Sequence, residues 1–404
     1  MVHNEQRTRP NKAGVHPVPD VSSRMERTYG LEFMMSAARA AWWLVGGAIL
    51  LTSCTRQPPT GGPLDVTVQF GEVGSSPGQF SYPRALDHDR SCLWVVDKLA
   101  RIQRLDPKTG RSLGEWQMPV WKDGKPTGLT AWDPDGQDGP LVFVPDTHYH
   151  QVWIYDGGSL EGAGLGTPLT RFGEYGTGPG QFVFPTDVAV LPGPDGVSIK
   201  RLYVSEYQEN DRISVYEARG HVTKASLVAA ARASAPAPSP FEFKFSFGKQ
   251  GSSTSPDNIE FSRPQSIAID QERQELIVND ACNHRIGRFT LDGALISWTN
   301  PEGVIGQQPG QLAYPYGLAL LPDGTVLVTE FGNNRVQHLD LRGGTPLGIY
   351  GEQGRYEGQL ASPWGIAVLG KTAYVLDSGN NRVTGFDVPR ARSVAGTAKR
   401  GGAG

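Results

Sequence analysis

The residues of this chain that could hold a metal or transfer a proton are few and scattered. His148 and His150 lie two positions apart in the stretch Asp-Thr-His-Tyr-His at 146–150, a spacing that could present two imidazoles to a metal. No third histidine lies near them, because His284 and His338 belong to distant segments. The sequence contains neither a Gly-x-Ser-x-Gly nucleophile motif nor a glycine-rich phosphate loop. We therefore predict no catalytic residue, no metal and no cofactor.

A more regular pattern pairs an acid with a hydrogen-bond donor four to six positions later. The acids are Asp97, Asp146, Glu206, Asp280, Glu330 and Asp377. The donors that follow them are Arg101, Gln151, Arg212, Arg285, Arg335 and Arg382. A catalytic residue has no reason to occur six times, so we predict that the pairs are structural. The carboxylate would accept backbone N–H groups of a turn, and the arginine would bind carbonyl oxygens.

These pairs belong to a repeated unit, which residues 310–340 show best. Three short β-rich runs, Gly317–Leu320, Val326–Thr329 and Val336–Leu339, are separated by turn sequences. A fourth run follows at Leu347–Tyr350, so we predict a four-stranded antiparallel sheet that must stack on its neighbours to bury its faces. Each copy opens with a proline, and the six prolines are Pro83, Pro126, Pro185, Pro264, Pro315 and Pro363.

Glycine-rich connections complete the unit. Phe-Gly-Glu or Tyr-Gly-Glu and then Gly-Gln-Phe or Gly-Gln-Leu precede several of the prolines, as at residues 70–80, 172–182 and 350–360. Together with the proline, the acid and Asn-x-Arg, this order of features resembles the NHL repeat. The resemblance covers the whole folded region and implies an all-β fold, a six-bladed β-propeller of four-stranded antiparallel blades. Copy two fits least, because it lacks Gly-Gln-Phe and has Gln151 in place of arginine.

The two ends of the repeat region should join. The last copy supplies only three strands by Val388, while Val66–Phe70 is an unpaired strand before the first copy. We predict that this N-terminal strand completes the last blade and removes an exposed sheet edge. The propeller would then span residues 65–388. We expect a mobile low-complexity loop at 218–240 in blade three and a disordered tail at 389–404.

The segment before the propeller is typical of export and anchoring. An uncharged run at residues 40–51 follows Arg39 and leads into Leu51-Thr52-Ser53-Cys54. This run is too short to span a bilayer, which needs about twenty residues, so a retained transmembrane helix is the weaker alternative. The ending resembles the lipobox of bacterial lipoproteins, which implies cleavage before Cys54 and lipidation of that cysteine.

We therefore expect residues 1–53 to be a leader and signal peptide, with the true start at Met34 or Met35. Residues 54–64, rich in proline and glycine, would be a flexible tether.

The positions at which the copies differ are the candidates for ligand binding. The residue after each strand-opening proline should stand at the rim of the central channel. Aromatic residues there could stack on a ligand and an arginine could pair with it, whereas a water-filled mouth is the alternative. The six rim residues are Arg84, Thr127, Thr186, Gln265, Tyr316 and Trp364.

Composition and charge limit the classes of partner that the protein is expected to bind. A net charge of −3 gives no reason to expect nucleic acid. We predict a binding or scaffold module, rather than an enzyme, for a protein, peptide or glycan. It would be lipid-anchored to a membrane of the bacterial cell envelope and would face the periplasm or the exterior.

The NHL resemblance also leaves an enzyme open, as a metal-dependent hydrolase or lyase. Similar propellers include the lyase that finishes peptide amidation, whose zinc is held by histidines directly after the strand-opening proline. Gluconolactonase-like propellers bind a divalent cation through acidic and amide side chains near the channel. This chain has no histidine at the six positions, and Asp187 is the one acid that could imitate such a ligand.

Overall fold

The structure is a computed structural model that describes residues 61–122, 125–136, 138–159, 161–233 and 238–388. The chain divides into two units, Met1–Thr55 and Arg56–Gly404, and every described residue belongs to the second. The predicted leader, Cys54 and the predicted tail at 389–404 lie outside the described residues. Among the residues that are described, no helix is both long and apolar enough to cross a membrane.

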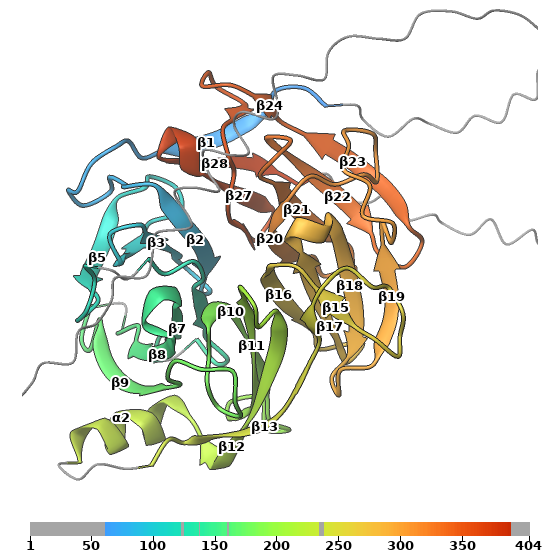
Figure 1. The fold of residues 1–404 in the computed structure, drawn as a ribbon. Coiled ribbons are helices and arrows are strands. Elements are labelled where there is room, and N and C mark those ends of the chain that lie inside the picture. Colours follow the sequence, from blue (N-terminus) through green and yellow to red (C-terminus); the bar gives the residue numbers. More distant parts are fainter. Residues whose placement is uncertain (1–60, 123–124, 137, 160, 234–237, 389–404) are drawn as a thin grey trace, which may run out of the picture. The chain divides into compact units, whose positions relative to one another are not determined.

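Six four-stranded antiparallel sheets form a ring, which confirms the predicted propeller (Figure 1). Blade 1 contains β2 (Pro83–His88), β3 (Leu93–Asp97), β4 (Arg101–Leu105) and β5 (Ser112–Gln117). Blade 2 contains β6 (Thr130–Trp132), β7 (Leu141–Asp146), β8 (Gln151–Asp156) and β9 (Thr167–Phe172). Blade 3 contains β10 (Phe184–Pro192), β11 (Ile199–Tyr207), β12 (Arg212–Val222) and β13 (Phe241–Phe247).

The remaining blades follow in the same order. Blade 4 contains β16 (Pro264–Asp270), β17 (Glu275–Asp280), β18 (Arg285–Thr290) and β19 (Leu295–Thr299). Blade 5 contains β20 (Pro315–Leu320), β21 (Val326–Glu330), β22 (Arg335–Asp340) and β23 (Thr345–Tyr350). Blade 6 contains β26 (Ile366–Leu369), β27 (Thr372–Asp377), β28 (Arg382–Asp387) and, from the other end of the chain, β1 (Val66–Phe70).

The ring closes as the sequence predicts. Strand β1 pairs antiparallel with β28, from Val66 opposite Phe386 to Phe70 opposite Val383 (Figure 1). Val66 packs against the core between blades 5 and 6, and Phe70 against the core between blades 6 and 1. The first strand of the propeller is therefore held by hydrogen bonds and by apolar contacts on both sides.

The core lies between the blades. Six apolar clusters occupy the six junctions between neighbouring sheets. Phe143 of blade 2 and Val204 of blade 3, for example, are fully buried in one of them. A sheet with two apolar faces is stable only between two others, so each blade depends on its neighbours.

The two faces of the ring differ in their connections. Residue pairs such as Pro83 opposite Asp97 and Pro315 opposite Glu330 place each proline beside the acid that ends the second strand. The loops that lead into each blade, and the turns between its second and third strands, lie on this side, which we call the proline face. The turns after the first and third strands lie on the opposite face.

The acid and the arginine of each repeat fix the loop on the proline face. In blade 5, Glu330 Oε1 accepts Arg335 Nε at 2.5 Å, and Oε2 accepts Asn333 Nδ2 at 2.6 Å and the Ala313 N–H at 2.9 Å. Arg335 Nη1 donates to Gln307 O at 2.6 Å. The same ion pair recurs at 2.7–3.0 Å as Asp97–Arg101, Glu206–Arg212, Asp280–Arg285 and Asp377–Arg382.

The residue before the arginine links one blade to the next. Asn334 and Asn381 adopt left-handed φ values of 54° and 55°, which asparagine tolerates better than most residues. Their side-chain oxygens accept the N–H groups of Ser362 and Tyr82, each at 2.7 Å, in the following blade. The Asn-x-Arg motif therefore binds its own blade and its neighbour together.

Blade 2 departs from this arrangement. Asp146 is fully buried, yet neither of its carboxylate oxygens accepts a hydrogen bond of normal geometry. Gln151 stands in place of the arginine, and its Oε1 accepts Arg171 Nη1 at 3.1 Å instead. Burial raises the pKa of Asp146 to about 7, and the polar side chains of Gln151 and Trp153 offset that effect only in part.

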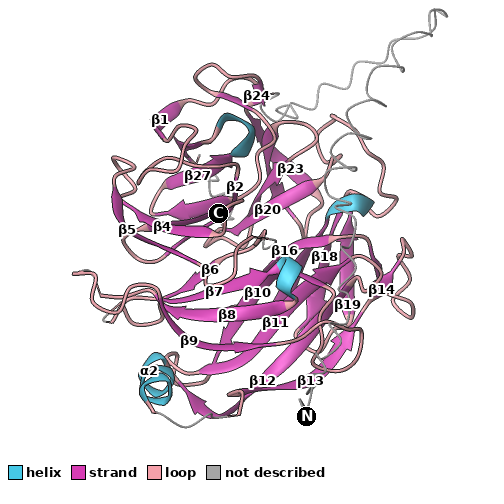
Figure 2. Cartoon of the chain, turned by 60° about the vertical axis from the view of Figure 1, so that its left-hand side comes forward, coloured by secondary structure: helices cyan, strands magenta, loops and turns pink. Residues whose placement is uncertain are grey.

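Two predicted segments differ from expectation. Within 218–240, predicted as a mobile loop, β12 continues to Val222 and helix α2 spans Lys224–Arg232 (Figure 2). A capping box of Thr223 and Ser226 starts the helix, and buried Leu227 packs on the core between blades 2 and 3. At the end of the predicted tether, Leu64 is also buried, and its N–H donates to Gly358 O at 2.8 Å.

Deletion of residues 65–71 should lower the thermal unfolding midpoint by roughly 10 °C or more, because β28 loses its partner and two apolar clusters lose contacts. Circular dichroism during heating measures this. The control is Thr67→Ser, which keeps the hydroxyl that donates to Gly385 O and should leave the midpoint nearly unchanged. An unchanged transition after the deletion would contradict the closure.

Asp146 should make the protein less stable as pH rises. The folded pKa of about 7 lies above the unfolded value of 3.8, so folded Asp146 keeps its proton while the unfolded chain loses it. The contribution of Asp146 to the free energy of unfolding should fall between about pH 4 and pH 7 and stay constant above pH 7. Asp146→Asn should remove the Asp146 contribution to the slope, leaving that of other buried acids such as Asp187 and Asp280, and add roughly 2–4 kcal/mol to the free energy of unfolding above pH 7.

Urea unfolding at several pH values measures this effect, and blade 5 supplies the matched control. Glu330→Gln should destabilise by about 3–5 kcal/mol, because Arg335 would be left buried without its partner. Gln151→Arg should supply the missing ion pair and reduce the slope in part, because a guanidinium lowers the pKa of a neighbouring carboxyl. If Asp146→Asn kept the pH dependence of the unmodified protein, Asp146 would not be its source.

Candidate functional site

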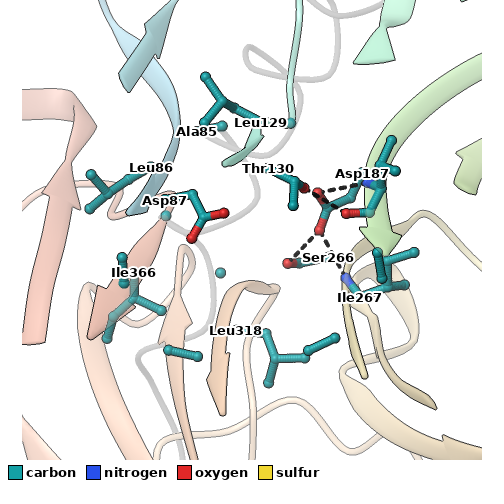
Figure 3. A pocket seen from close by; sticks show the side chains of 18 of the residues that line it. Ala85, Leu86, Asp87, Leu129, Thr130, Asp187, Ser266, Ile267, Leu318 and Ile366 are labelled. Carbon is teal, nitrogen blue, oxygen red and sulfur yellow. Dashed lines mark hydrogen bonds between the residues drawn. The ribbon is translucent and has the colours of Figure 1, made fainter. Parts of the chain in front are cut away.

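A cavity of about 420 Å³ runs along the centre of the ring. The innermost strand of every blade lines it: β2, β10, β16, β20 and β26, and in blade 2 the segment that ends in β6. Leu86, Leu129, Leu318 and Ile366 border it (Figure 3), but each also packs in the core between two blades, and polar groups contribute at least as much of the wall as apolar ones. The volume of this cavity lies within the range of small-ligand sites.

The six predicted rim residues lie at the proline-face end of this cavity. Five of them line it: Arg84, Thr127, Gln265, Tyr316 and Trp364. Thr186 is outside the cavity wall, and its hydroxyl donates to Pro264 O at 2.7 Å. All six are buried, with at most 6% of any side chain exposed.

Aromatic rings and guanidinium groups fill this end of the channel. The rings of Tyr316 and Trp364 are 4.9 Å apart, and Tyr316 also stacks on Phe331 at 4.8 Å. Arg84 lies 5.2 Å from the ring of Trp364, and Arg263 lies 5.2 Å from that of Tyr316. The predicted stacking residues therefore contact one another and close the channel on the proline face.

Two carboxylates lie further along the channel. Asp187 Oδ2 accepts the Ser266 hydroxyl at 2.9 Å and the Ile267 N–H at 3.0 Å, and Asp87 Oδ2 accepts the Ala131 N–H at 2.8 Å. Both side chains point toward the centre (Figure 3). Burial raises the pKa of Asp187 to about 7, with a contribution from the negative charge of Asp87, and burial also raises the pKa of Asp87.

Sequence reasoning identified Asp187 but missed Asp87. A comparison of the copies would have singled out Asp87. Six residues lie four positions after a strand-opening proline, and those at 189, 268, 319 and 367 are alanine. Asp87 and Thr130 are the exceptions. Nothing in the sequence shows that Asp87 and Asp187 share a cavity, since they come from blades 1 and 3.

The channel opens at its other end. A second cavity of about 400 Å³ shares His88, Ala131, Trp132 and Gln271 with the first. His88 and Trp132 are half-buried and Gln271 is exposed, whereas the residues at the proline-face end are buried. Exposure along the wall therefore increases away from the proline face, a feature that the sequence did not predict.

The acid pair can attract a positively charged group or exchange a proton near neutral pH. It lacks the further side-chain ligands of a typical metal site: the described part of the chain contains no cluster of three or more His, Cys, Asp or Glu residues able to hold a metal. The two histidines at 148 and 150 pack instead on aromatic rings. His148 lies 5.5 Å from Phe184, and His150 lies 4.8 Å from Tyr175.

Among curated proteins, the chain is similar to two peptide-amidating enzymes. It is 31% identical to the peptidylglycine alpha-amidating monooxygenase of Rattus norvegicus over 167 residues, which are 41% of this chain and 14% of that protein. It is 32% identical to the Mus musculus enzyme over 92 residues, 22% of this chain and 9% of that protein. Each match therefore spans less than a sixth of the relative.

Among solved structures, a protein of unknown function from Bacteroides thetaiotaomicron is 15% identical, covers 82% of this chain and 75% of its own, and has a TM-score of 0.50. A streptogramin B lyase is also 15% identical, covers 79% and 96% of the two chains, and has a TM-score of 0.48. At 15% identity, the likeness to the Bacteroides protein concerns the fold alone. A family model for the NHL repeat matches residues 312–339, which include most of β20–β22. The chain is thus a six-bladed β-propeller that carries an NHL repeat in blade 5.

Proposed function

We propose that this propeller is a non-enzymatic binding module that receives part of a protein, peptide or glycan in its central channel. The proposal rests on one observation, that the channel is open at one end only. Buried side chains close it on the proline face, while half-buried His88 and Trp132 border its opening on the opposite face. A ligand therefore enters from the opposite face and reaches Asp87 and Asp187.

The wall of the channel defines what fits there. Polar and apolar groups line the channel together, and among the polar ones Asp87 and Asp187 select hydroxyl, amide or ammonium groups. Trp132 at the opening offers a ring edge or face to a sugar or an aromatic side chain. Five of the predicted rim residues, all but Thr186, are then the closed end of the site and contact only a ligand that fills the whole channel.

We further propose that Cys54 carries a lipid and holds the propeller at a membrane of a bacterial cell envelope, facing the periplasm or the exterior. The support is the sequence Leu51-Thr52-Ser53-Cys54 after an uncharged run. Nucleic acid is not among the proposed partners, because the chain has a net charge of −3.

A metal-dependent hydrolase or lyase is the second candidate, and a specific observation favours it. The curated relatives are amidating enzymes, and two carboxylates, which are oxygen ligands, face one cavity here. Asp187, Asp87 and the hydroxyl of Thr130 could hold a hard cation such as Ca²⁺. Against it, the oxygens of Asp187 already accept hydrogen bonds from Val188, Ser266 and Ile267.

Binding of ligands identified on glycan and peptide arrays should be weakened when the open half of the channel is altered. Trp132→Ala and Asp187→Asn should each lower the affinity for such a ligand by roughly tenfold, because each removes a contact inside the cavity. Isothermal calorimetry measures the affinities. Ile296→Ser, at an exposed residue outside the channel, is the control. A ligand that bound all three variants as tightly as the original protein would not occupy the channel.

Metal analysis separates the two candidates. As a binding module, the purified chain should contain no stoichiometric zinc or calcium whose removal abolishes ligand binding. Mass spectrometry before and after chelation measures the metal, and Asp87→Asn with Asp187→Asn tests its ligands. Stoichiometric metal that disappears in this double variant together with a hydrolase or lyase activity would favour the enzyme.

A further inference from the structure

The turns around the open end of the channel carry an excess of negative charge. We call them the inner turns, and they join the first and second strands at residues 89–92, 133–140, 193–198, 271–274, 321–325 and 370–371. Together they contain seven acids and three basic residues, a net charge of −4. The exposed acids are Asp135, Asp138, Asp195, Glu272 and Asp323, and the other two are Asp89 and Asp133.

The basic residues of the inner turns already have acidic neighbours. They are Arg90, Arg273 and Lys371, and each lies within 4.0 Å of a carboxylate oxygen. The outer turns of the same face, which follow the third strands at 106–111, 157–166, 223–240, 291–294 and 341–344, contain five basic residues and three acids. The negative charge of this face is therefore concentrated around the mouth of the channel.

Two further acids continue this charge into the channel. Asp87 and Asp187 point toward its centre (Figure 3), and their printed hydrogen-bond partners are neutral N–H and hydroxyl groups, such as the Ala131 N–H and the Ser266 hydroxyl. In the described part of the chain, neither carboxylate forms an ion pair with an arginine or a lysine. A cationic group that enters the mouth therefore meets acids along its whole path.

The chain leaves the propeller beside this mouth. Strand β28 ends at Asp387, and the Val388 N–H donates to Lys371 O, in the inner turn of blade 6, at 2.9 Å. Val388 and Val368 pack on the same core, and Val368 also lines the cavity. Neighbouring strands are about 4.8 Å apart, so the third strand of a blade lies about 10 Å from the first, which lines the channel.

The sequence beyond Val388 is basic. Residues 389–404 contain no acid and four basic residues, which gives a charge of +4 against the −4 of the inner turns. The basic residues are Arg390, Arg392, Lys399 and Arg400. An extended chain advances at most about 3.5 Å per residue, so Arg392 can stand about 14 Å from Val388. That reach exceeds the distance of about 10 Å to the channel wall.

We propose that residues 389–404 bind the open end of the channel in their own chain, with basic side chains directed at the inner turns and at Asp87 and Asp187. The inference rests on the proposed binding channel and makes a basic peptide segment its ligand. A short tether gives an effective concentration of about 1 mM, so a contact that is weak between separate molecules forms within one chain. Any other ligand has to displace this segment.

A peptide added in trans tests the proposal. A synthetic peptide of residues 389–404 with an N-terminal fluorescein is titrated with the full chain and with a variant that ends at Val388. Both carry Cys54→Ser, so that neither is acylated. We expect the shortened variant to bind the peptide, and fluorescence anisotropy measures the affinity. Raising the salt concentration from about 0.05 M to 0.5 M should weaken this binding severalfold, because salt screens the charges.

The full chain should bind the peptide more weakly, because its own segment competes. With a dissociation constant of about 0.1 mM for the shortened variant, an effective concentration of about 1 mM lowers the apparent affinity about tenfold. A full chain in which Arg390, Arg392, Lys399 and Arg400 are all replaced by glutamine should bind the peptide as tightly as the shortened variant. These four positions lie outside the described propeller, so its fold should persist by circular dichroism.

Substitutions in the shortened variant locate the contact. Asp87→Asn with Asp187→Asn should lower the affinity for the peptide severalfold, and so should Asp138→Asn with Glu272→Gln in the inner turns. Glu161→Gln removes one exposed acid from an outer turn and is the control that should leave the affinity unchanged. An equal loss in Glu161→Gln would show that the peptide senses only the net charge, and would overturn the proposed site.

Other outcomes also count against the proposal. Equal affinities of the full chain and the shortened variant, or no binding of the peptide to the shortened variant, would refute the self-contact. An array ligand that depended on Trp132 but bound both chains equally would refute it too, and would leave the binding channel intact. Light scattering that showed dimers of the full chain but not of the shortened variant would assign the segment to the channel of a second copy.

Discussion

The buried ion pair at the end of each second strand is the interaction on which the propeller depends. Removing a carboxylate from water is costly, and the cost is offset only when hydrogen bonds replace the lost solvent. In five blades an arginine and at least one backbone N–H do so, and the arginine binds carbonyls of the incoming loop at the same time. The pair thus converts a glycine-rich connection into a fixed part of the sheet. Asp146 shows the same burial without the partner.

This network also makes the two faces of the ring unlike. The ion pairs, the left-handed Asn334 and Asn381 and the strand-opening prolines are all on the proline face. Loops fixed in this way bring Tyr316, Trp364 and Arg84 together and close the channel. The opposite face carries the turns after the first and third strands, including the segment with α2 in blade 3, and there the wall opens at His88 and Trp132. The architecture of the repeat therefore makes the two ends of the cavity different.

Sequence reasoning predicted much of the fold and part of the site. The six copies, their strands, the structural role of the acid–arginine pairs and the closure by Val66–Phe70 are confirmed. The helix at Lys224–Arg232 was missed because the low-complexity sequence predicted a mobile loop, although Leu227 packs on the core. Of the predicted rim residues, five line the cavity and all are buried. Asp87, His88 and Trp132 were missed because the prediction used only the residue directly after each strand-opening proline, and these three lie further along the strand.

The sequence by itself determined the features that each copy repeats. Turn residues, strand periodicity and the acid–arginine spacing are local, and six copies of one pattern leave little ambiguity about the unit and its number. Only the tertiary structure decided which side chains meet and are buried at the propeller axis. Asp87 and Asp187 come from strands a hundred residues apart, and Tyr316 and Trp364 are buried because neighbouring blades converge on them. Burial and long-range contact depend on how the blades are placed around the axis, and no single repeat contains that information.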